Sequence, residues 1–114
     1  MSDQCDLLCL NLEIAEGLRH RARATENLAQ SAQLHSALGD ELRLAMLASL
    51  AESELCGCDL AWIHERSQSL VSHHMKLLVA AGLVAPRRDG KVVFFSLTEL
   101  GEAQIPAPNE TTRV

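Results

Sequence analysis

The chain has 114 residues, of which 47% are apolar, and this composition predicts one folded domain rather than a disordered polypeptide. Its net charge of −5 comes from 10 basic and 15 acidic side chains, which taken as a whole argues against nucleic-acid binding. The charge is distributed unevenly along the chain. Residues 66–91 sum to +4, whereas residues 39–65 sum to −5. A small basic face on an acidic body is typical of locally placed DNA contacts.

The first residues, MSDQCDLLCLNLEIAE, contain no basic segment ahead of an apolar stretch, as a signal peptide would. No stretch of the chain approaches the roughly 18 apolar residues of a membrane span. We therefore expect a cytoplasmic protein without a membrane partner, in a compartment where thiols stay reduced. Its four cysteines are then expected to be metal ligands or reactive thiols before disulfides.

Three helices are predicted in the first half of the chain. Residues 10–24 form the first, because they carry an apolar stripe at four-residue spacing, Leu10, Ile14 and Leu18. Thr25 can cap a second helix, which Gly39 ends. Asp40 caps a third, whose expected buried residues are Leu42, Ala45, Met46, Ser49 and Leu50.

Two further helices are predicted in quick succession, over about 58–65 and 67–82, the second capped by Ser67. The second helix is expected to bury one face, which comprises Leu70, Val71, Leu77, Leu78 and Ala81. Its opposite face is polar and comprises Gln68, Ser69, Ser72, His73 and Lys76. Such a pair is typical of a helix-turn-helix, so we expect this polar face to contact DNA, with Gln68 and Ser69 nearest the base edges.

The spacing of apolar residues then changes from a helical to a strand-like pattern. The stretch LVAPRRDGKVVFFSL predicts a β-hairpin that turns at Asp89–Gly90. Pro86 cannot donate a ladder hydrogen bond, so its strand is predicted to lie at an edge. The hairpin tip gathers cations that suit phosphates or the minor groove, unless they are merely a solvated tip: Arg87, Arg88 and Lys91. With a short helix over about 98–105, the predicted fold is mainly α with a small β-hairpin, a winged helix-turn-helix.

Three motifs in this order, ELCGCDLA, SQSLVSHHMKLLVAAGLV and RRDGKVVFFSL, resemble the ArsR/SmtB family of metal-responsive bacterial repressors over residues 34–98. The two cysteine pairs resemble more narrowly its CadC-like cadmium, lead and zinc sensors. The resemblance implies a homodimer in which the N-terminal thiols of one subunit join the CxC pair of the other. It also implies a repressor that leaves its double-stranded operator when metal binds. The expected organisation is an arm over 1–11, a winged domain over 12–105 and a disordered tail over 106–114.

Two departures from the family pattern shape this expectation. The arsenic sensors nearest to the CxC motif place a third cysteine where this chain has Ala61, which argues against arsenic. No histidine follows His74, so the family's zinc site on the C-terminal helix is expected to be absent.

The chemistry of the thiols supports a metal site. Thiolates select soft or borderline ions such as Cd(II), Pb(II), Cu(I) or Zn(II), and four of them can close a tetrahedral site. The predicted ligands are Cys5, Cys9, Cys56 and Cys58. Positions i and i+2 do not share one side of a helix, so the CxC pair requires an irregular helix start, which Gly57 permits. A helix N-terminus also favours the thiolate form.

Other readings of these residues stay open. The cysteines could be small buried hydrophobes, a redox switch within either pair, a structural zinc site, or part of a small thiol enzyme or metal-trafficking protein. Because no CxxC, Gly-rich cofactor loop or evident Ser-His-Asp set is present, we expect a non-enzyme. Among the histidines, His73 is expected to contact DNA, His74 to lie in the core, and His64 to be structural or a weak outer partner of the CxC site.

Overall fold

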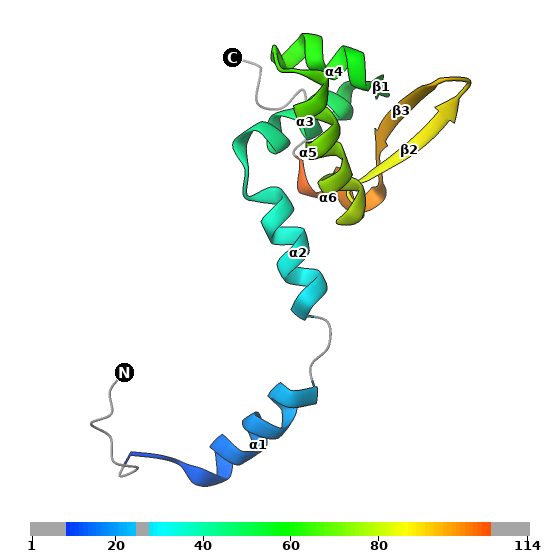
Figure 1. Cartoon of the computed structure of the whole chain (residues 1–114). Coiled ribbons are helices and arrows are strands. Elements are labelled where there is room, and N and C mark those ends of the chain that lie inside the picture. Colours follow the sequence, from blue (N-terminus) through cyan, green and yellow to red (C-terminus); the bar gives the residue numbers. More distant parts are fainter. Residues whose placement is uncertain (1–8, 25–27, 106–114) are drawn as a thin grey trace.

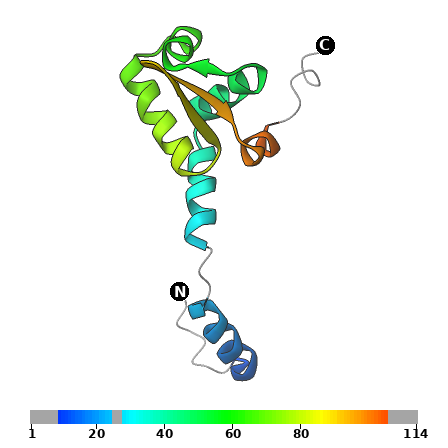
Figure 2. The same cartoon turned by 90° about the vertical axis from the view of Figure 1, so that its right-hand side faces the viewer.

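The computed structural model describes residues 9–24 and 28–105. The elements run in the order α1 (Leu12–Ala24), α2 (Leu28–Leu38), α3 (Glu41–Glu52), β1 (Leu55–Cys56), α4 (Gly57–His64), α5 (Gln68–Ala80), β2 (Val84–Asp89), β3 (Val92–Leu97) and α6 (Glu99–Gln104). Helices α3 to α6 and the strands form a compact body, α2 leads away from it, and α1 lies apart (Figures 1 and 2). The predicted cap Thr25, Cys5 and the tail 106–114 fall outside the described residues.

The core of the body is built mainly by α3 and α5, with single residues from α2 and α4 and two from the start of the hairpin. Its largest fully buried side chains are Met46, Leu47, Leu60, Val71, Met75, Leu78 and Leu83. On α3 the prediction was right for Met46 and Leu50, but Ala45 is exposed and Leu47 is buried instead. The cap by Asp40 is confirmed, since its Oδ1 accepts a hydrogen bond from the Arg43 N–H at 3.0 Å.

The buried face of α5 is turned relative to the predicted one. Val71 and Leu78 are buried as expected, whereas Leu70 and Leu77 are 36% and 38% exposed, so their prediction was wrong. The observed face follows the i, i+3, i+4, i+7 pattern and comprises Val71, His74, Met75 and Leu78. Leu70 and Leu77 each precede a residue of this pattern and therefore lie at its margin. Ser67 caps the helix, because its Oγ accepts the Leu70 N–H at 3.1 Å.

A three-stranded antiparallel sheet carries the hairpin, with the strands in the order β1-β3-β2. The predicted hairpin is confirmed, and its turn places Gly90 at φ +65. Pro86 lies on β2, an edge strand, as predicted. No pattern in the sequence predicted β1, which pairs Cys56 with Phe94. This pairing anchors the CxC segment to the hairpin.

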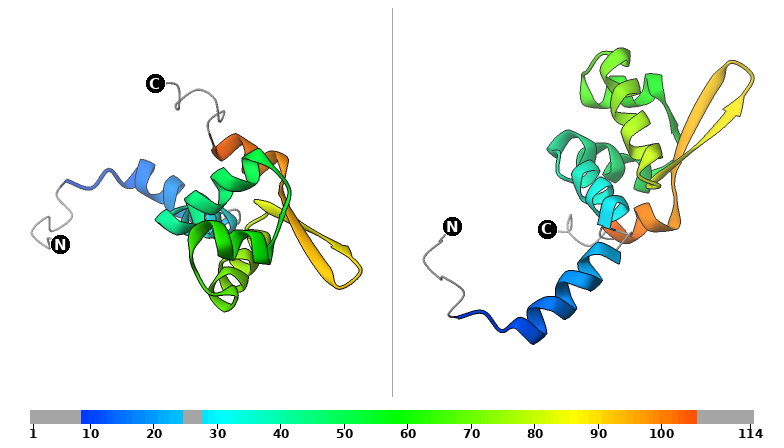
Figure 3. Two further views of the ribbon diagram at one scale, coloured as in Figure 1. Left: turned by 90° about the horizontal axis from the view of Figure 1, so that it is seen from above. Right: turned by 60° about the horizontal axis from the view of Figure 1, so that its bottom comes forward.

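The base of the hairpin is tied to the end of α5. Gly82, at φ +81, ends this helix, and the Thr98 Oγ1 donates a hydrogen bond of 2.7 Å to its carbonyl. The same Oγ1 accepts the Gly101 N–H at 3.1 Å and so caps α6. The base is therefore fixed, while the tip of the hairpin projects away from the helices (Figure 3).

Candidate metal centre and nucleic-acid interface

The CxC pair lies where β1 passes into α4. Cys56 caps the helix in an extended conformation, φ −91 and ψ 173, and Cys58 lies in the first helical turn. Because Cys56 is outside the helix, the two thiols are not held to the diverging directions of helical i and i+2 positions. The predicted irregular helix start is thus observed. Cys58 is exposed and Cys56 is half-buried.

Asp59 is a third donor at this place, and reasoning from the sequence missed it. Its Oδ2 accepts hydrogen bonds from the Cys56 N–H at 3.2 Å and from the Cys56 Sγ at 3.3 Å. The signal was available, since an acid three residues after a helix cap commonly reaches back to the cap. The carboxylate lies beside the Cys56 sulfur, where it can accept the thiol proton when the thiolate forms.

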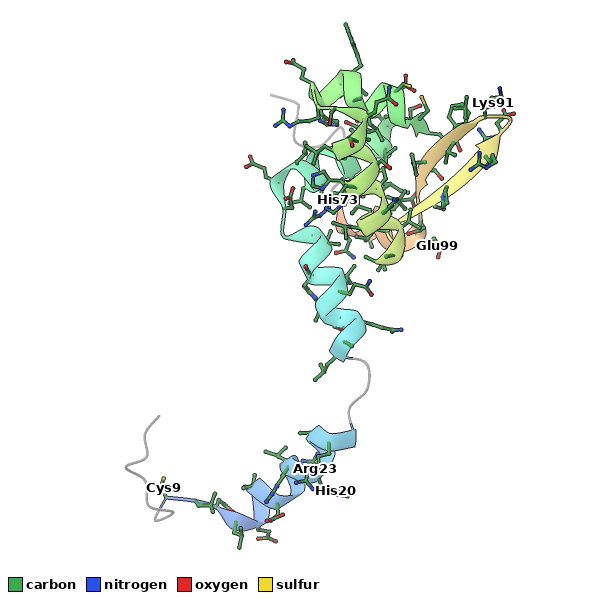
Figure 4. All side chains as sticks on the ribbon, in the orientation of Figure 1. Cys9, His20, Arg23, His73, Lys91 and Glu99 are labelled. Carbon is green, nitrogen blue, oxygen red and sulfur yellow. The ribbon has the colours of Figure 1, made fainter. Side chains whose placement is uncertain are left out.

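The structure does not bring the N-terminal thiols to this place within one chain. Cys9 is exposed and lies beyond the far end of α1, away from the hairpin tip that carries Lys91 (Figure 4). Across residues 9–24 and 28–105, no three His, Cys, Asp or Glu side chains are grouped as a metal site. The CxC pair therefore supplies two sulfurs, and the four-thiol ligand set stays a prediction.

The two histidines nearest the body's core both have structural contacts. His74 is buried, as predicted, and the Arg43 Nη1 donates to its Nδ1 at 3.0 Å. Burial and the nearby Arg43 charge lower the pKa of His74. The His64 Nε2 lies 3.0 Å from the Ser49 Oγ and links α4 to α3, and burial lowers its pKa too. A role for His64 next to the metal stays a prediction.

The predicted DNA-reading face of α5 is open to solvent. Its five residues are all exposed: Gln68, Ser69, Ser72, His73 and Lys76. The ring of His73 points out from α5 on the body (Figure 4), 5.6 Å from that of His74. The helix thus separates a buried apolar face from a polar face, as DNA-reading helices do.

The hairpin cations, predicted as one cluster, divide between the two faces of the sheet. Arg87 makes a two-pronged ion pair with Glu54, with Nε–Oε2 and Nη2–Oε1 distances of 2.9 and 2.8 Å. Its guanidinium carbon also lies 4.9 Å from the centre of the Phe94 ring. This pairing raises the pKa of Arg87 and lowers that of Glu54. Arg88, the next residue along the strand, points to the opposite face.

A groove of about 740 Å³ runs between α5 and the hairpin. Cys56, Gly57 and Cys58 line it together with the predicted DNA contacts Gln68, Ser72, Lys76, Arg88 and Lys91. The remaining lining is apolar, and none of the lining residues is acidic. One concave surface therefore joins the thiol pair to most of the predicted DNA contacts, while Arg87, Ser69 and His73 lie outside its lining.

Comparison with known proteins agrees with this architecture. Residues 40–85 match the family model described as bacterial regulatory protein, arsR family. The chain is 37% identical over 95 residues to the transcriptional repressor SmtB homolog of Synechocystis, which covers 83% of this chain and 72% of that protein. It is 36% identical over 96 residues to the cadmium resistance transcriptional regulatory protein CadC homolog of Staphylococcus aureus, covering 81% and 79%. The arsenical resistance operon repressor of Escherichia coli is 42% identical over 67 residues, covering 58% and 57%.

Solved structures show the same fold. HlyU from Vibrio cholerae superposes with a TM-score of 0.63 at 34% identity, covering 69% of this chain and 87% of that one. A homodimeric winged helix-turn-helix DNA-binding domain from Mycobacterium bovis gives a TM-score of 0.63 at 27% identity, covering 68% and 71%. In the described part of the chain, no helix has the length and apolar character that a membrane crossing requires. The chain therefore belongs to the arsR family of bacterial regulatory proteins, and the relatives from Synechocystis and Escherichia coli named above are repressors.

Proposed function

We propose that this protein is a homodimeric repressor that binds its operator without metal and releases it when Cd(II), Pb(II) or Zn(II) binds a thiolate site. The proposed ligands are Cys56 and Cys58 together with Cys5 and Cys9, the latter pair contributed by the other subunit. The dimer is supported by the homodimeric relative of the same fold. Release requires that the metal bind the DNA-free state more tightly than the DNA-bound one.

One observation carries this proposal: the thiol pair and the DNA-reading residues line the same groove. Cys56 is hydrogen-bonded into the sheet next to Phe94, and the hairpin carries Arg88 and Lys91. A metal that draws the two sulfurs and other ligands together acts on the segment that positions the hairpin relative to α5. A coupling of about 3 kcal/mol between the two ligands weakens DNA binding on the order of 100-fold.

The donor set favours soft ions but does not rank them. Thiolates bind Cd(II), Pb(II) and Zn(II), and the Asp59 carboxylate adds an oxygen donor that all three accept. Ala61 occupies the place where the arsenic sensors that resemble this chain have a third cysteine, so we expect arsenite to bind more weakly.

Metal titration tests the site directly. We expect Cd(II), added without oxygen to the reduced protein, to give an ultraviolet thiolate-to-metal band that saturates at one ion per subunit. Each of Cys5→Ser, Cys9→Ser, Cys56→Ser and Cys58→Ser should weaken this band and the release of operator DNA. If Cys5→Ser and Cys9→Ser bind and respond like the wild type, the site is limited to the CxC segment. If no band forms, reversible oxidation of the thiols replaces metal as the signal.

The divided hairpin cations provide a matched test of DNA binding. Arg88 lines the groove, whereas Arg87 is held by Glu54 on the other face. We expect Arg88→Ala to weaken binding to all sequences alike and to lower the salt slope by about 1, because one phosphate contact is lost. Arg87→Ala, the same change one residue away, should leave that slope nearly unchanged. Equal slopes for both variants and the wild type would remove Arg88 from the interface.

A further inference from the structure

The groove between α5 and the hairpin has an apolar floor that DNA does not need. The partly or fully exposed apolar residues of this floor are Val79, Pro86, Val92, Val93 and Phe95, whereas Val71 and Met75 also line it but are buried in the core. The rim of the groove carries polar residues, among them Gln68, Lys76, Arg88 and Lys91. Phosphates and base edges are polar, so they contact this rim and leave the apolar floor uncovered. An apolar floor with a basic rim fits an amphipathic, acidic segment better than it fits a nucleic acid alone.

The chain itself carries such a segment, which the proposed function has not used. The apolar stripe is open to solvent, with Leu10, just before α1, 44% exposed, and Ile14 and Leu18 in the first half of α1 57% and 52% exposed. The helical part from Leu12 to Leu18 spans about 9 Å at 1.5 Å per residue, and α5 spans about 16 Å from Gln68 to Val79. The stripe is therefore short enough to lie along the floor of the groove.

Charge is complementary between the same two surfaces. Residues 10–18 carry two acids, Glu13 and Glu16, and no base. The groove is lined by three cations, Lys76, Arg88 and Lys91, and by no acid. Glu16 lies 3.7 Å from Arg19, but both side chains are largely exposed, so this pair holds the carboxylate weakly. The acids of α1 are thus free to face the basic rim.

We propose that metal binding seats the first half of α1 of one subunit in the α5–hairpin groove of the other, where it displaces DNA. This inference rests on the proposed metal site, because Cys9 directly precedes the stripe and the CxC pair lines the groove. A metal shared by Cys9 and Cys58 places the stripe at the thiol end. The second copy is the occupant because α1 of the same chain lies away from α5 and the hairpin, whose residues line the groove (Figures 1 to 3).

The consequence is competition for one surface. The acids of α1 and the phosphates of DNA would both use Lys76, Arg88 and Lys91, so they cannot be bound together. Without metal, the exposed stripe has no sulfur tether and the groove is open to DNA. With metal, the tether raises the local concentration of the acidic helix at the groove, and the operator is displaced.

Contact between methyl groups of different subunits tests the docking. In a mixed dimer, one subunit carries ¹³C at its valine methyls and the other at its isoleucine δ1 methyls. On adding Cd(II) we expect a cross-peak between the methyls of Ile14 and those of Val92, which lines the groove and is 43% exposed. Val84, buried in the core and outside the groove, serves as the internal control and should show none between subunits. A full thiolate band without the Val92–Ile14 cross-peak overturns the docking and leaves the metal site standing.

A charge exchange tests the competition with DNA. The variant Glu13→Lys/Glu16→Lys keeps all thiols but repels the basic rim. Its matched control, Glu99→Lys/Glu102→Lys, makes the same change on exposed α6 and corrects for the general gain in DNA affinity. We expect Cd(II) to weaken operator binding on the order of 100-fold in the wild type and control but about tenfold or less in the α1 variant.

The outcomes separate the two proposals. If the α1 variant forms the thiolate band yet releases DNA as fully as the control, the helix does not compete for the groove and the inference is overturned. If the wild type forms no band with Cd(II), the metal site fails first and the docking falls with it. If the α1 variant forms the thiolate band but releases less operator DNA than the control, the result supports both the metal site and the docking.

Discussion

Helix α1 and the helices of the body have similar apolar spacing but opposite surroundings. On α3 and α5 the apolar face is buried, with Met46, Leu47 and Leu78 fully enclosed. On α1, Ile14 and Leu18 of the stripe are 57% and 52% exposed. Periodicity therefore predicts a helix and the direction of its apolar face, but not the surface that covers it. The body forms its core within one chain, whereas the apolar stripe of α1 is exposed.

The largest expected effect contrasts two leucines, one in each region. Leu47→Ala should lower the free energy of unfolding by about 2–5 kcal/mol, because it leaves a cavity in a closed core. Leu18→Ala should cost less than about 0.5 kcal/mol in the metal-free protein, since the side chain is 52% exposed. Urea unfolding followed by circular dichroism measures both; Trp62, the one tryptophan, is 84% exposed and a poor reporter.

The contrast between α1 and the body would not hold if Leu47→Ala and Leu18→Ala lowered the free energy of unfolding by the same amount. That result would mean that α1 is already packed, before metal binds, as tightly as the core. Repeating Leu18→Ala with Cd(II) present sharpens the contrast, because a docked α1 should then make the substitution more costly.

A second prediction concerns the tight base of the hairpin. A Cβ on Gly101 would lie 2.2 Å from the Leu83 carbonyl oxygen, which is backbone and cannot move alone. We expect Gly101→Ala to lower the free energy of unfolding by about 1–3 kcal/mol, as overpacking does. Gly57→Ala is the control, because nothing lies within 4 Å of its added Cβ. Equal urea midpoints for the two variants would show that α6 can shift without cost.

Stability should also fall as the pH is lowered below neutral. The pKa values of His64 and His74 are below 6.5 in the folded state, mainly because burial disfavours the charged ring. Protonation of His74 would also break its bond with Arg43, which can only donate. Below pH 6.5 the unfolded chain therefore binds more protons than the folded protein does. The stability that the neutral rings of His64 and His74 contribute is complete above pH 6.5 and is lost as the pH falls toward their folded pKa values.

Urea titrations between pH 7.5 and 5.5 measure this dependence. We expect the double variant His64→Gln/His74→Gln to have a flatter pH profile than the wild type over that range. A profile as steep as that of the wild type would assign the pH dependence to other groups.

Local rules predicted the winged helix-turn-helix well, and long-range contacts are where they failed. The caps Asp40 and Ser67 and the turn at Asp89–Gly90 depend on neighbours within a few residues, and all three are observed. The β1 strand has two residues and exists because β3 pairs with it from about forty positions later. The Arg87–Glu54 pair likewise joins residues 33 positions apart.

The same limit applies to the candidate site. The CxC pair and the polar face of α5 were predicted from spacing, but their shared groove depends on how the hairpin folds back over α5. Asp59 was missed because its role follows from the cap geometry of Cys56 rather than from a ligand motif. Whether Cys5 and Cys9 complete the site depends on a second chain, which no intrachain pattern encodes.

The smallest expected effect concerns the turn between α4 and α5, within the body. Glu65 has φ 55 and ψ 50, a left-handed conformation that costs an ordinary residue roughly 1–2 kcal/mol. Glycine removes this cost but loses about 0.5–1 kcal/mol through the greater freedom of the unfolded chain. We therefore expect Glu65→Gly to raise the free energy of unfolding by less than about 1 kcal/mol. Glu65→Ala, which keeps the strain, should not raise it; a gain in both variants would instead implicate the lost charge.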